Sequence, residues 1–421
     1  MLLIQERSCS HLELLKDSGE LYKRRAAMAR WSKNRIEGIG ARRGLMAASD
    51  KETARRVGAV REGMKESGLR ALIVFSTVVL GEKAAVRYLS NYRLLTRKDY
   101  MVVPLEGEPA LVVATLNHQK GAATASWIRD IRWGATTEGM IAEVAGKIKA
   151  CGLETGTIGI VGLSGSIPHY DYDLLQKALP GASFTDATGL LDEIRLSKSP
   201  EEIEMVRETA RIADACYELV LDILRPGVDE REVMAPVAGL LARKGVEDTL
   251  ILSAKGRSFP CFLTPPGAYV FEEGDHYVFS IEISGPGGYW SQIVRPMCLG
   301  RPAAEYERLF EAGRLALEAG EACLVPGARA GDVARAVADE VRKAGLETGL
   351  WCGHGMGMDL GDGVGLSEDN PLELREGAVI TIHPHVMLPD RKKGLLMGDT
   401  FVVRAGGGQN LSRTTCELKR L

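Results

Sequence analysis

Three histidines and one glutamate have the side chains best suited to acid/base chemistry. His354 lies among glycines in the segment 353–357 (GHGMG), while His383 and His385 end an apolar run. Imidazole titrates near neutral pH, so we expect His354 and His383 to act as general acid or base. His385, two residues along an expected strand, should face the same side as His383. Glu282 would orient one imidazole or bind a cationic group of a substrate.

The same side chains also form a possible metal site. Two imidazoles and a carboxylate, from His354, His383 and Glu282, are the ligand set of many iron and zinc sites. The sequence contains no HExxH segment or equivalent spacing that would fix their geometry. One divalent metal ion at these three residues therefore remains an alternative.

Cys261 and Asp399 are weaker candidates. Cys261 lies in the loop 257–266, and a nucleophilic thiol needs a nearby base, which His354 would supply. A buried, inert cysteine is the simpler interpretation, and both stay open. Asp399 would orient a histidine or bind a cationic group, as Glu282 would. The glycine-rich segments 353–357 and 361–365 lack the lysine of a phosphate-binding loop.

The elements that must position these residues fall into two parts. Short apolar runs such as 71–75, 100–104 and 158–161 alternate with helical stretches, which predicts an α/β part with a mixed sheet. Ser199, Pro200 and Glu202 then form a capping box with proline at the first helical position. We expect a packed helix of about six turns from there to the Pro226-Gly227 turn.

The second part contains a faint internal repeat. The segment 224–233 (LRPGVDEREV) is echoed by 324–333 (LVPGARAGDV), and each stands between two helical patterns. The helices that follow are expected at 230–244 and 332–344. This duplication predicts two similar halves, with strands at 277–283 and 378–383 facing each other around a central hollow.

Composition excludes several classes of protein. The chain has 421 residues, so two domains are expected. Its net charge of −3, with 26% charged residues, indicates no general attraction to nucleic acid or anionic membranes. Eight scattered cysteines without CxxC spacing indicate reduced thiols. No apolar run approaches the ~20 residues of a membrane span. We therefore predict a cytoplasmic protein. The basic segment before residue 49 is expected to be an extension, with Met28 and Met46 as other possible starts.

Several segments together carry a family resemblance. They occur in the family's order and spacing: 193–203 (EIRLSKSPEEI), 288–295 (GYWSQIVR), 353–357, 374–384 (LREGAVITIHP) and 397–400 (MGDT). From about Asp50 to its end the chain resembles the creatinase and aminopeptidase P ("pita-bread") family. The resemblance implies an N-terminal creatinase-like domain at 50–195, after an extension at 1–49. It implies a C-terminal pita-bread domain with an internal pseudo-twofold repeat at 196–421.

The resemblance also implies a metal centre that this sequence alters. Metal-dependent members hold two divalent ions with two aspartates, one histidine and two glutamates, and the bridged water attacks a peptide carbonyl. Those positions fall at Glu282 or its neighbour, Gln292, His354, His383 and Gly398. Only the histidine is unchanged, so we expect a degenerate metal site, no dinuclear metalloaminopeptidase and no cofactor.

The creatinase branch offers the nearer likeness. The segment 382–389 (IHPHVMLP) resembles creatinase, and Arg97-Lys98 resembles a pair that reaches a substrate carboxylate from the neighbouring subunit. The creatinase catalytic histidine, however, falls at Leu263, and its paired glutamate falls at Val294. The chain is therefore not creatinase itself.

These observations predict a creatinase-like, metal-independent hydrolase of a C–N bond. Its substrate would be a small carboxylate-bearing molecule: an amidine, a guanidino acid or an acylamino acid. Catalysis is expected from His354, His383 and Glu282. Substrate binding is expected from five residues: Arg97, His385, Gln292, Asp399 and Cys261. The resemblance implies a homodimer in which Arg97 acts in the partner's site. The alternatives are a mononuclear-metal hydrolase or lyase, or a module that only binds peptides or small ligands.

Overall fold

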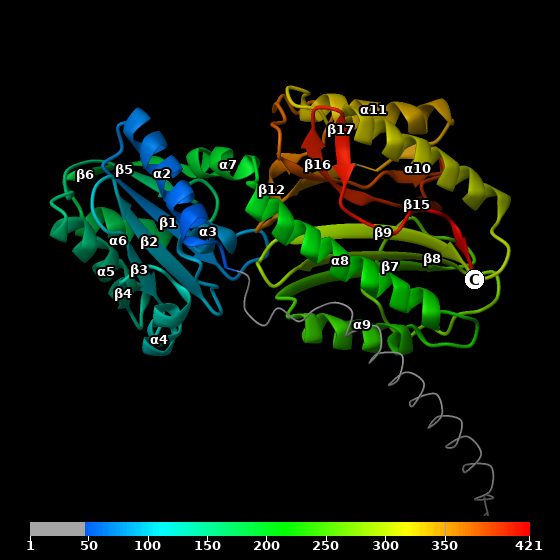
Figure 1. Ribbon diagram of the computed structural model, residues 1–421, viewed down its shortest axis with the longest axis horizontal. Coiled ribbons are helices and arrows are strands. Elements are labelled where there is room, and N and C mark those ends of the chain that lie inside the picture. The colour runs from blue at the N-terminus through cyan, green and yellow to red at the C-terminus, as the bar shows by residue number, and fades with distance from the viewer. Residues whose placement is uncertain (1–46, 350) are drawn as a thin grey trace, which may run out of the picture. The chain divides into compact units, whose positions relative to one another are not determined.

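The computed structural model describes residues 47–349 and 351–421, and residues 46–421 form one compact unit (Figure 1). Residues 1–46 of the predicted extension 1–49, with the alternative starts Met28 and Met46, lie outside the described residues. The boundary expected near residue 196 stays a prediction.

A six-stranded mixed sheet forms the N-terminal part, in the order β4-β3-β2-β1-β5-β6. The central pairing of β1 with β2 is antiparallel, and β1 with β5 is parallel. The predicted runs at 71–75, 100–104 and 158–161 all lie in this sheet. Its strands are β1 (Ala71–Thr77), β2 (Lys98–Pro104), β3 (Ala110–Val113), β4 (Asp130–Trp133), β5 (Gly156–Val161) and β6 (Ala182–Asp186). The helices packed with it are α2 (Asp50–Glu66), α3 (Ala84–Ser90), α4 (Leu116–Ala125), α5 (Thr137–Ala150), α6 (His169–Ala178) and α7 (Thr188–Leu196).

Two helix pairs with matching turns confirm the internal repeat. The pairs are α8 (Pro200–Ile223) with α9 (Glu230–Lys244), and α10 (Ala304–Cys323) with α11 (Ala330–Lys343). The Ser199 side chain accepts from the Glu202 N–H, and the Glu202 carboxylate accepts from the Ser199 N–H, as the predicted capping box requires. Gly227 and Gly327 both have a φ of 86°, which glycine adopts without steric cost.

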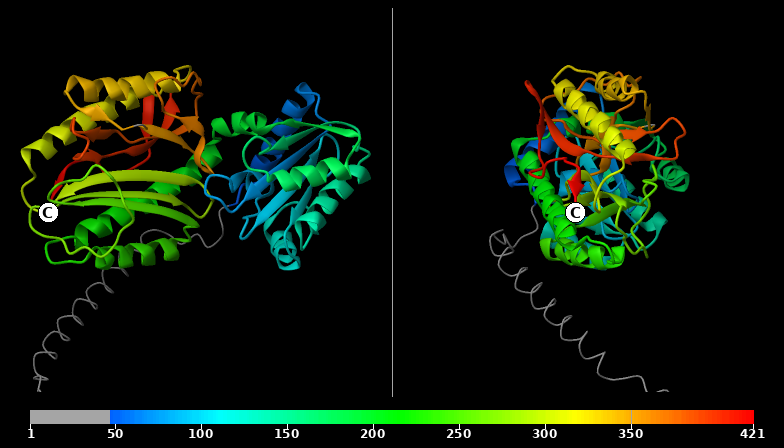
Figure 2. Two further views of the ribbon diagram at one scale, coloured as in Figure 1. Left: turned by 180° about the vertical axis from the view of Figure 1, so that it is seen from behind. Right: turned by 90° about the vertical axis from the view of Figure 1, so that its right-hand side faces the viewer.

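Three sheets lie between these helix pairs, with α8 and α9 on one side and α10 and α11 on the other (Figures 1 and 2). The first has the order β18-β9-β8-β7, the second β12-β11-β13-β16-β17, and the third β10-β14-β15. Their strands are β7 (Asp248–Gly256), β8 (His276–Ser284), β9 (Trp290–Cys298), β10 (Glu347–Thr348), β11 (Gly353–Met356), β12 (Leu360–Gly365), β13 (Val379–Ile382), β14 (His385–Met387), β15 (Gly394–Leu396), β16 (Asp399–Arg404), β17 (Gly407–Asn410) and β18 (Lys419–Arg420).

Backbone hydrogen bonds join the first two sheets where the candidate residues meet. The Val294 N–H donates to the Gly398 carbonyl at 2.9 Å, and the Gly398 N–H donates to the Val294 carbonyl at 3.1 Å. Strand β9 is thereby held against the start of β16. The Gln292 N–H donates to Thr400 Oγ1 at 3.0 Å and adds a second link.

One predicted strand is shorter in the structure than expected. Strand β13 ends at Ile382, and His385 begins β14 in another sheet. Pro384 between them has no N–H with which to continue the ladder. The expectation that His383 and His385 lie on one continuous strand is therefore wrong.

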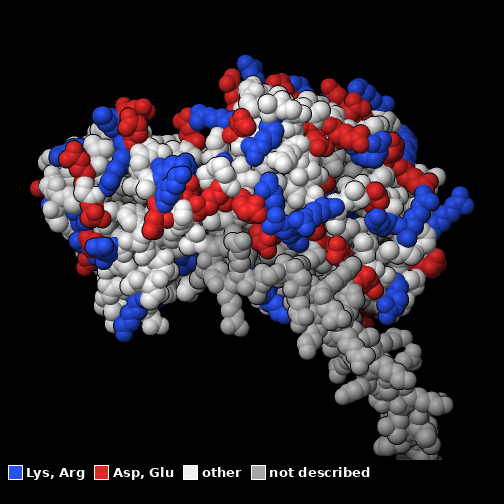
Figure 3. Space-filling view, in the orientation of Figure 1, with Lys and Arg blue, Asp and Glu red and all other residues white. Residues whose placement is uncertain are grey.

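The surface agrees with the expectation from net charge. On the face seen in Figure 3, basic and acidic side chains are interspersed, and no large patch of one sign is visible. Across the described residues, none of the helices is both long enough and apolar enough to span a bilayer.

Candidate active site

His354 lies on β11 with one ring nitrogen fixed by the backbone. Its Nδ1 stands 3.1 Å from the Gly355 carbonyl oxygen, so Nδ1 carries the proton and donates it there. The other nitrogen, Nε2, lies 3.9 Å from Glu282 Oε2. Burial lowers the pKa of His354 because the charged ring would lose its hydration. At neutral pH Nε2 is therefore an unprotonated acceptor that faces a carboxyl group.

Glu282 lies on β8, in a register that places it opposite Gln292 on β9. Its side chain is buried, and Oε1 accepts a hydrogen bond from Gln292 Nε2 at 2.9 Å. Oε2 has no hydrogen-bond partner in the structure. Burial raises the pKa of Glu282 to about 7, so the group exchanges a proton near neutral pH.

His383 follows the end of β13 and stands beside His354. The two ring centres are 5.3 Å apart, and His383 Nδ1 has no hydrogen-bond partner. Burial, and to a smaller extent the neighbouring His354 ring, together lower the pKa of His383 to about 3. His383 is therefore neutral at any physiological pH.

The structure thus brings together the three residues predicted to be catalytic. A carboxyl group with a pKa near 7 and two neutral imidazoles share a partly buried site. Two polar atoms there, Glu282 Oε2 and His383 Nδ1, have no protein partner. Such atoms are costly to bury unless something binds them, which indicates a ligand-binding site.

Gln292 was predicted to bind substrate, but its side chain bonds to protein groups instead. Its Nε2 donates to Glu282, and its Oε1 accepts from Thr381 Oγ1 at 3.0 Å. Both ends of the amide are therefore occupied by protein groups. The sequence offered no signal for Thr381, because a threonine in a strand has no local feature that reveals a distant partner.

His385 and Cys261 lie together but bond to the backbone. His385 Nε2 donates to the Cys261 carbonyl oxygen at 2.6 Å, and the Cys261 thiol donates to the Arg391 carbonyl oxygen at 2.9 Å. Burial raises the pKa of the Cys261 thiol, which disfavours the thiolate that a nucleophile needs. Both residues hold the loop 257–266 in place.

Asp399 forms a buried ion pair. Its carboxylate accepts from Arg295 Nη2 at 2.6 Å, and both side chains are almost fully buried. Arg295 also donates to the Gly398 carbonyl oxygen at 2.8 Å. This pair joins β9 to β16 behind the site. Sequence reasoning missed the role of Arg295, which nothing local to its strand signals.

Arg97 lies on the N-terminal part, on the exposed surface. Its φ of 66° is uncommon for a residue with a side chain, and its Nη1 donates to the Ala135 carbonyl oxygen at 3.3 Å. The neighbouring Lys98 instead points inward and pairs with Asp171. Of the two basic residues suggested by the resemblance, only Arg97 is exposed.

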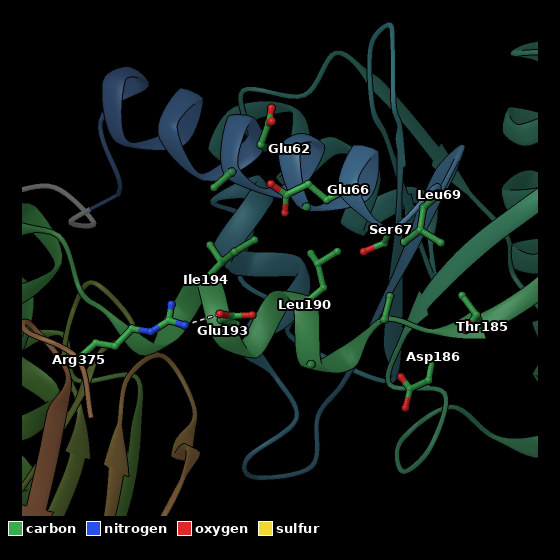
Figure 4. Close-up of a pocket in the computed structure, with 14 residues that line it drawn as sticks. Glu62, Glu66, Ser67, Leu69, Thr185, Asp186, Leu190, Glu193, Ile194 and Arg375 are labelled. Atoms are coloured by element: carbon green, nitrogen blue, oxygen red, sulfur yellow. Dashed lines mark hydrogen bonds and ion pairs between the residues drawn. The ribbon is translucent and has the colours of Figure 1, made fainter. Parts of the chain in front are cut away.

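A wide groove lies elsewhere, between α2 and α7. It encloses about 720 Å³ and is lined by Glu62, Glu66, Leu190 and Ile194, with Glu193 paired to Arg375 at one end (Figure 4). None of the catalytic candidates lines it. Groove size alone therefore does not locate the chemistry in this molecule.

Comparison with known proteins identifies the family. Residues 56–197 match the creatinase/prolidase N-terminal domain, and residues 204–405 match metallopeptidase family M24. The chain belongs to the creatinase and aminopeptidase P family. The mixed sheet of the first part and the duplicated helix pairs of the second are the two-domain fold of this family.

Relatives of the chain include proteins named as peptidases. An Xaa-Pro dipeptidase of Lactobacillus helveticus is 26% identical over 327 residues, 76% of this chain and 87% of that protein. An uncharacterized hydrolase/peptidase of Sinorhizobium fredii, y4tL, is 32% identical over 254 residues, 57% of this chain. The match spans 63% of that relative's length, and 65% of a Bacillus subtilis relative's length.

Solved structures share the fold. An Xaa-Pro dipeptidase from Bacillus anthracis superposes with a TM-score of 0.75 at 22% identity, covering 88% of this chain and 100% of that one. The prolidase from Pyrococcus horikoshii gives a TM-score of 0.73 at 22% identity, covering 86% and 99%.

These comparisons correct the prediction that the protein uses no cofactor. The family is one of metallopeptidases, so absence of a metal is not the expectation for a member. The residues present nevertheless do not match a dinuclear carboxylate centre, because three of the four carboxylate positions hold an amide, an imidazole and a glycine. Within residues 47–349 and 351–421, no three His, Cys, Asp or Glu side chains are already arranged around a common point as ligands.

Proposed function

We propose that this protein hydrolyses a C–N bond in a small molecule that carries a carboxylate. The candidate substrates are short peptides, acylamino acids, guanidino acids and amidines. The observation that supports this most directly is the buried Glu282 carboxyl, whose free Oε2 faces the unprotonated Nε2 of His354. Several relatives are Xaa-Pro dipeptidases, and a dipeptidase cleaves the C–N bond of a peptide.

The pKa values suggest how the proton moves. Glu282 in its ionised form accepts a proton from a water molecule, and the hydroxide equivalent attacks the carbon of the C–N bond. The protonated Glu282 then donates that proton to the leaving nitrogen. His354 Nε2 accepts a hydrogen bond from the attacking water and orients it. His383, whose pKa lies near 3, acts as an acceptor and not as an acid.

A screen with isotope-labelled water tests the proposal. The purified chain is incubated with Xaa-Pro dipeptides, acylamino acids, guanidino acids and amidino acids in water enriched in ¹⁸O, and products are followed by mass spectrometry. Hydrolysis releases an amine or ammonia and places one ¹⁸O atom in the other product. A product that lacks ¹⁸O would indicate elimination and contradict the proposal, and ligand binding without any product would indicate a binding module.

Variants connect the activity to the site. Glu282→Gln keeps the size of the side chain but removes the exchangeable proton, and we expect a rate lower by about 10²–10⁴-fold. Glu108→Gln, on the exposed surface of the N-terminal part, is the matched control and should leave the rate unchanged. Equal activity of both variants would place catalysis elsewhere.

We further propose that the protein acts as a homodimer in which Arg97 reaches the partner's site. Four large apolar side chains near Arg97 are exposed: Val78, Val79, Leu80 and Leu95. The Val78 N–H donates to the Arg97 carbonyl oxygen at 3.2 Å, so the two segments lie side by side. An exposed apolar cluster beside a cation is typical of a protein interface.

Subunit mixing tests the dimer. Arg97→Ala and Glu282→Gln are each expected to be inactive alone, because one lacks the carboxylate clamp and the other the proton carrier. Each mixed dimer would have one intact site of two, about half of the wild-type activity, and random mixing, in which about half of the dimers are mixed, would give about a quarter overall. A monomer by light scattering, or no recovery on mixing and refolding, would refute the arrangement. Leu95→Asp should shift the protein toward the monomer.

A further inference from the structure

The metal ligands that the family resemblance implies meet two obstacles in this chain. The five positions hold Glu282, Gln292, His354, His383 and Gly398. Of these, Gln292 has a neutral amide in place of a carboxylate, and Gly398 has no side chain. A metal site can tolerate one such change. The residues around Gln292 and Gly398 therefore decide whether a second metal ion still has room to bind.

Gln292 is held by protein groups on both sides. Its Nε2 donates to Glu282 Oε1 at 2.9 Å, and its Oε1 accepts from Thr381 Oγ1 at 3.0 Å. Thr381 Oγ1 also lies 3.2 Å from the Asp399 carbonyl oxygen. All three side chains are buried. The amide therefore fills its position with a hydrogen-bonded chain from Glu282 to β16, and also occupies one oxygen of Glu282.

The backbone closes the space at position 398. A Cβ atom added to Gly398 would lie 2.5 Å from the Ile382 carbonyl oxygen and 2.7 Å from His383 Cβ. These distances are shorter than any normal contact with a Cβ atom. The hydrogen bonds between Gly398 and Val294 fix this approach from the other side. No side chain at position 398 could reach the site without moving β13 or β16.

The donors that remain are few. His354 Nε2 lies 3.9 Å from Glu282 Oε2, and the His354 ring stands 5.3 Å from that of His383, so these groups offer one free carboxylate oxygen to balance charge. Two divalent ions at close distance need several carboxylates to bridge them and offset their repulsion.

We propose that this chain does not assemble the two-ion centre of its metallopeptidase family, because protein groups fill the place of the second ion. The Glu282–Gln292–Thr381 chain occupies one side of that place, and the close approach of Gly398 to Ile382 and His383 occupies the other. The site holds fewer than two divalent ions per chain. This concerns the same site as the proposed function, but the ion count does not depend on turnover, so either can fail while the other stands.

Counting bound ions tests the inference. The full chain, purified without a metal-affinity tag, is loaded separately with Mn²⁺, Co²⁺ and Zn²⁺, passed through a desalting column and measured by elemental mass spectrometry. We expect a ratio below two for each ion. His354→Ala shows which ions belong to the site, and His169→Ala, a histidine that is 88% exposed, is the control for the loss of an imidazole.

The number of ions lost in His354→Ala decides whether the inference holds. A ratio near two that falls in His354→Ala but persists in His169→Ala overturns the inference. A ratio below two supports it, as does a surplus that His354→Ala leaves in place, because those ions lie outside the site. Gln292→Asp restores a carboxylate at one position only, and its site should still hold fewer than two ions. If that single change brings the site to two ions, the argument from Gly398 is wrong.

Discussion

Asp99 allows a quantitative prediction about stability. It lies on β2 with its side chain fully buried, and neither carboxylate oxygen has a hydrogen bond of normal geometry, so the Ala114 N–H interacts with the carboxyl group only weakly. Burial raises the pKa of Asp99 from 3.8 to about 8, and the backbone N–H of Ala114 opposes this shift only in part. The group is therefore protonated in the folded protein at neutral pH, whereas in the unfolded chain it is ionised.

The sign of the pH effect follows from linkage. Because the folded pKa lies above the unfolded one, the free energy of unfolding is highest below pH ~4, falls as pH rises, and levels off above pH ~8. At about 1.36 kcal/mol per pKa unit, the shifted pKa lowers the free energy of unfolding, relative to pH below ~4, by about 4 kcal/mol at pH 7 and by up to about 6 kcal/mol at high pH. Asp99→Asn removes this dependence. Its buried amide carries a cost of about 1–3 kcal/mol that does not vary with pH.

Urea unfolding between pH 4.5 and 9.5, followed by circular dichroism, measures the effect. The difference in unfolding free energy between Asp99→Asn and wild type should grow by about 1.36 kcal/mol per pH unit up to pH ~8 and then stay constant. Asp173→Asn, on α6 beside the same sheet, is the control for the loss of a carboxylate that is not fully buried, since its side chain is 39% exposed. A difference that does not change with pH would show that Asp99 is ionised in the folded protein and that the reasoning is wrong.

Three other predictions concern the site and the core. Burial raises the pKa of Glu282 to about 7, so an activity that needs the ionised carboxylate should rise as pH passes 7. Initial rates measured against pH test this. A flat profile from pH 5 to 9 would contradict the role of Glu282 as base. Gly398→Ala should lower the free energy of unfolding by about 1–3 kcal/mol through overpacking, whereas Gly406→Ala, with open space around it, should stay near wild type in the same urea titration. Arg195→Met removes the cation paired with the buried Asp359 and should lower the free energy of unfolding by about 3–5 kcal/mol, measured as a lower urea midpoint. An unchanged midpoint would mean that Asp359 takes up a proton at little cost.

Features that depend on local sequence were predictable. The helix from Pro200 needed only the Ser199 cap and the proline, and the Pro-Gly turns at 226 and 326 needed only residues that favour such turns. The three catalytic candidates were found through segments that the family shares. These signals lie within a few residues of one another, so one sequence suffices to detect them.

Features that depend on distant partners were not predictable. Gln292 was expected to contact substrate, but Thr381, which is 89 positions away, takes one end of its amide. His385 was expected beside His383, but Pro384 ends the strand and the Cys261 carbonyl holds the ring. In each case the residue type is compatible with either role, and the partner that decides between them comes close only in the folded chain.

The strands around the site are held together by residues other than Glu282, His354 and His383. The distance between β9 and β16 is set by paired backbone hydrogen bonds at Val294 and Gly398 and by the buried Arg295–Asp399 pair. None of these interactions involves Glu282, His354 or His383. Substitution at Glu282, His354 or His383 therefore alters what the site can bind without removing the bonds that hold its walls, so a common fold does not by itself imply a common metal centre.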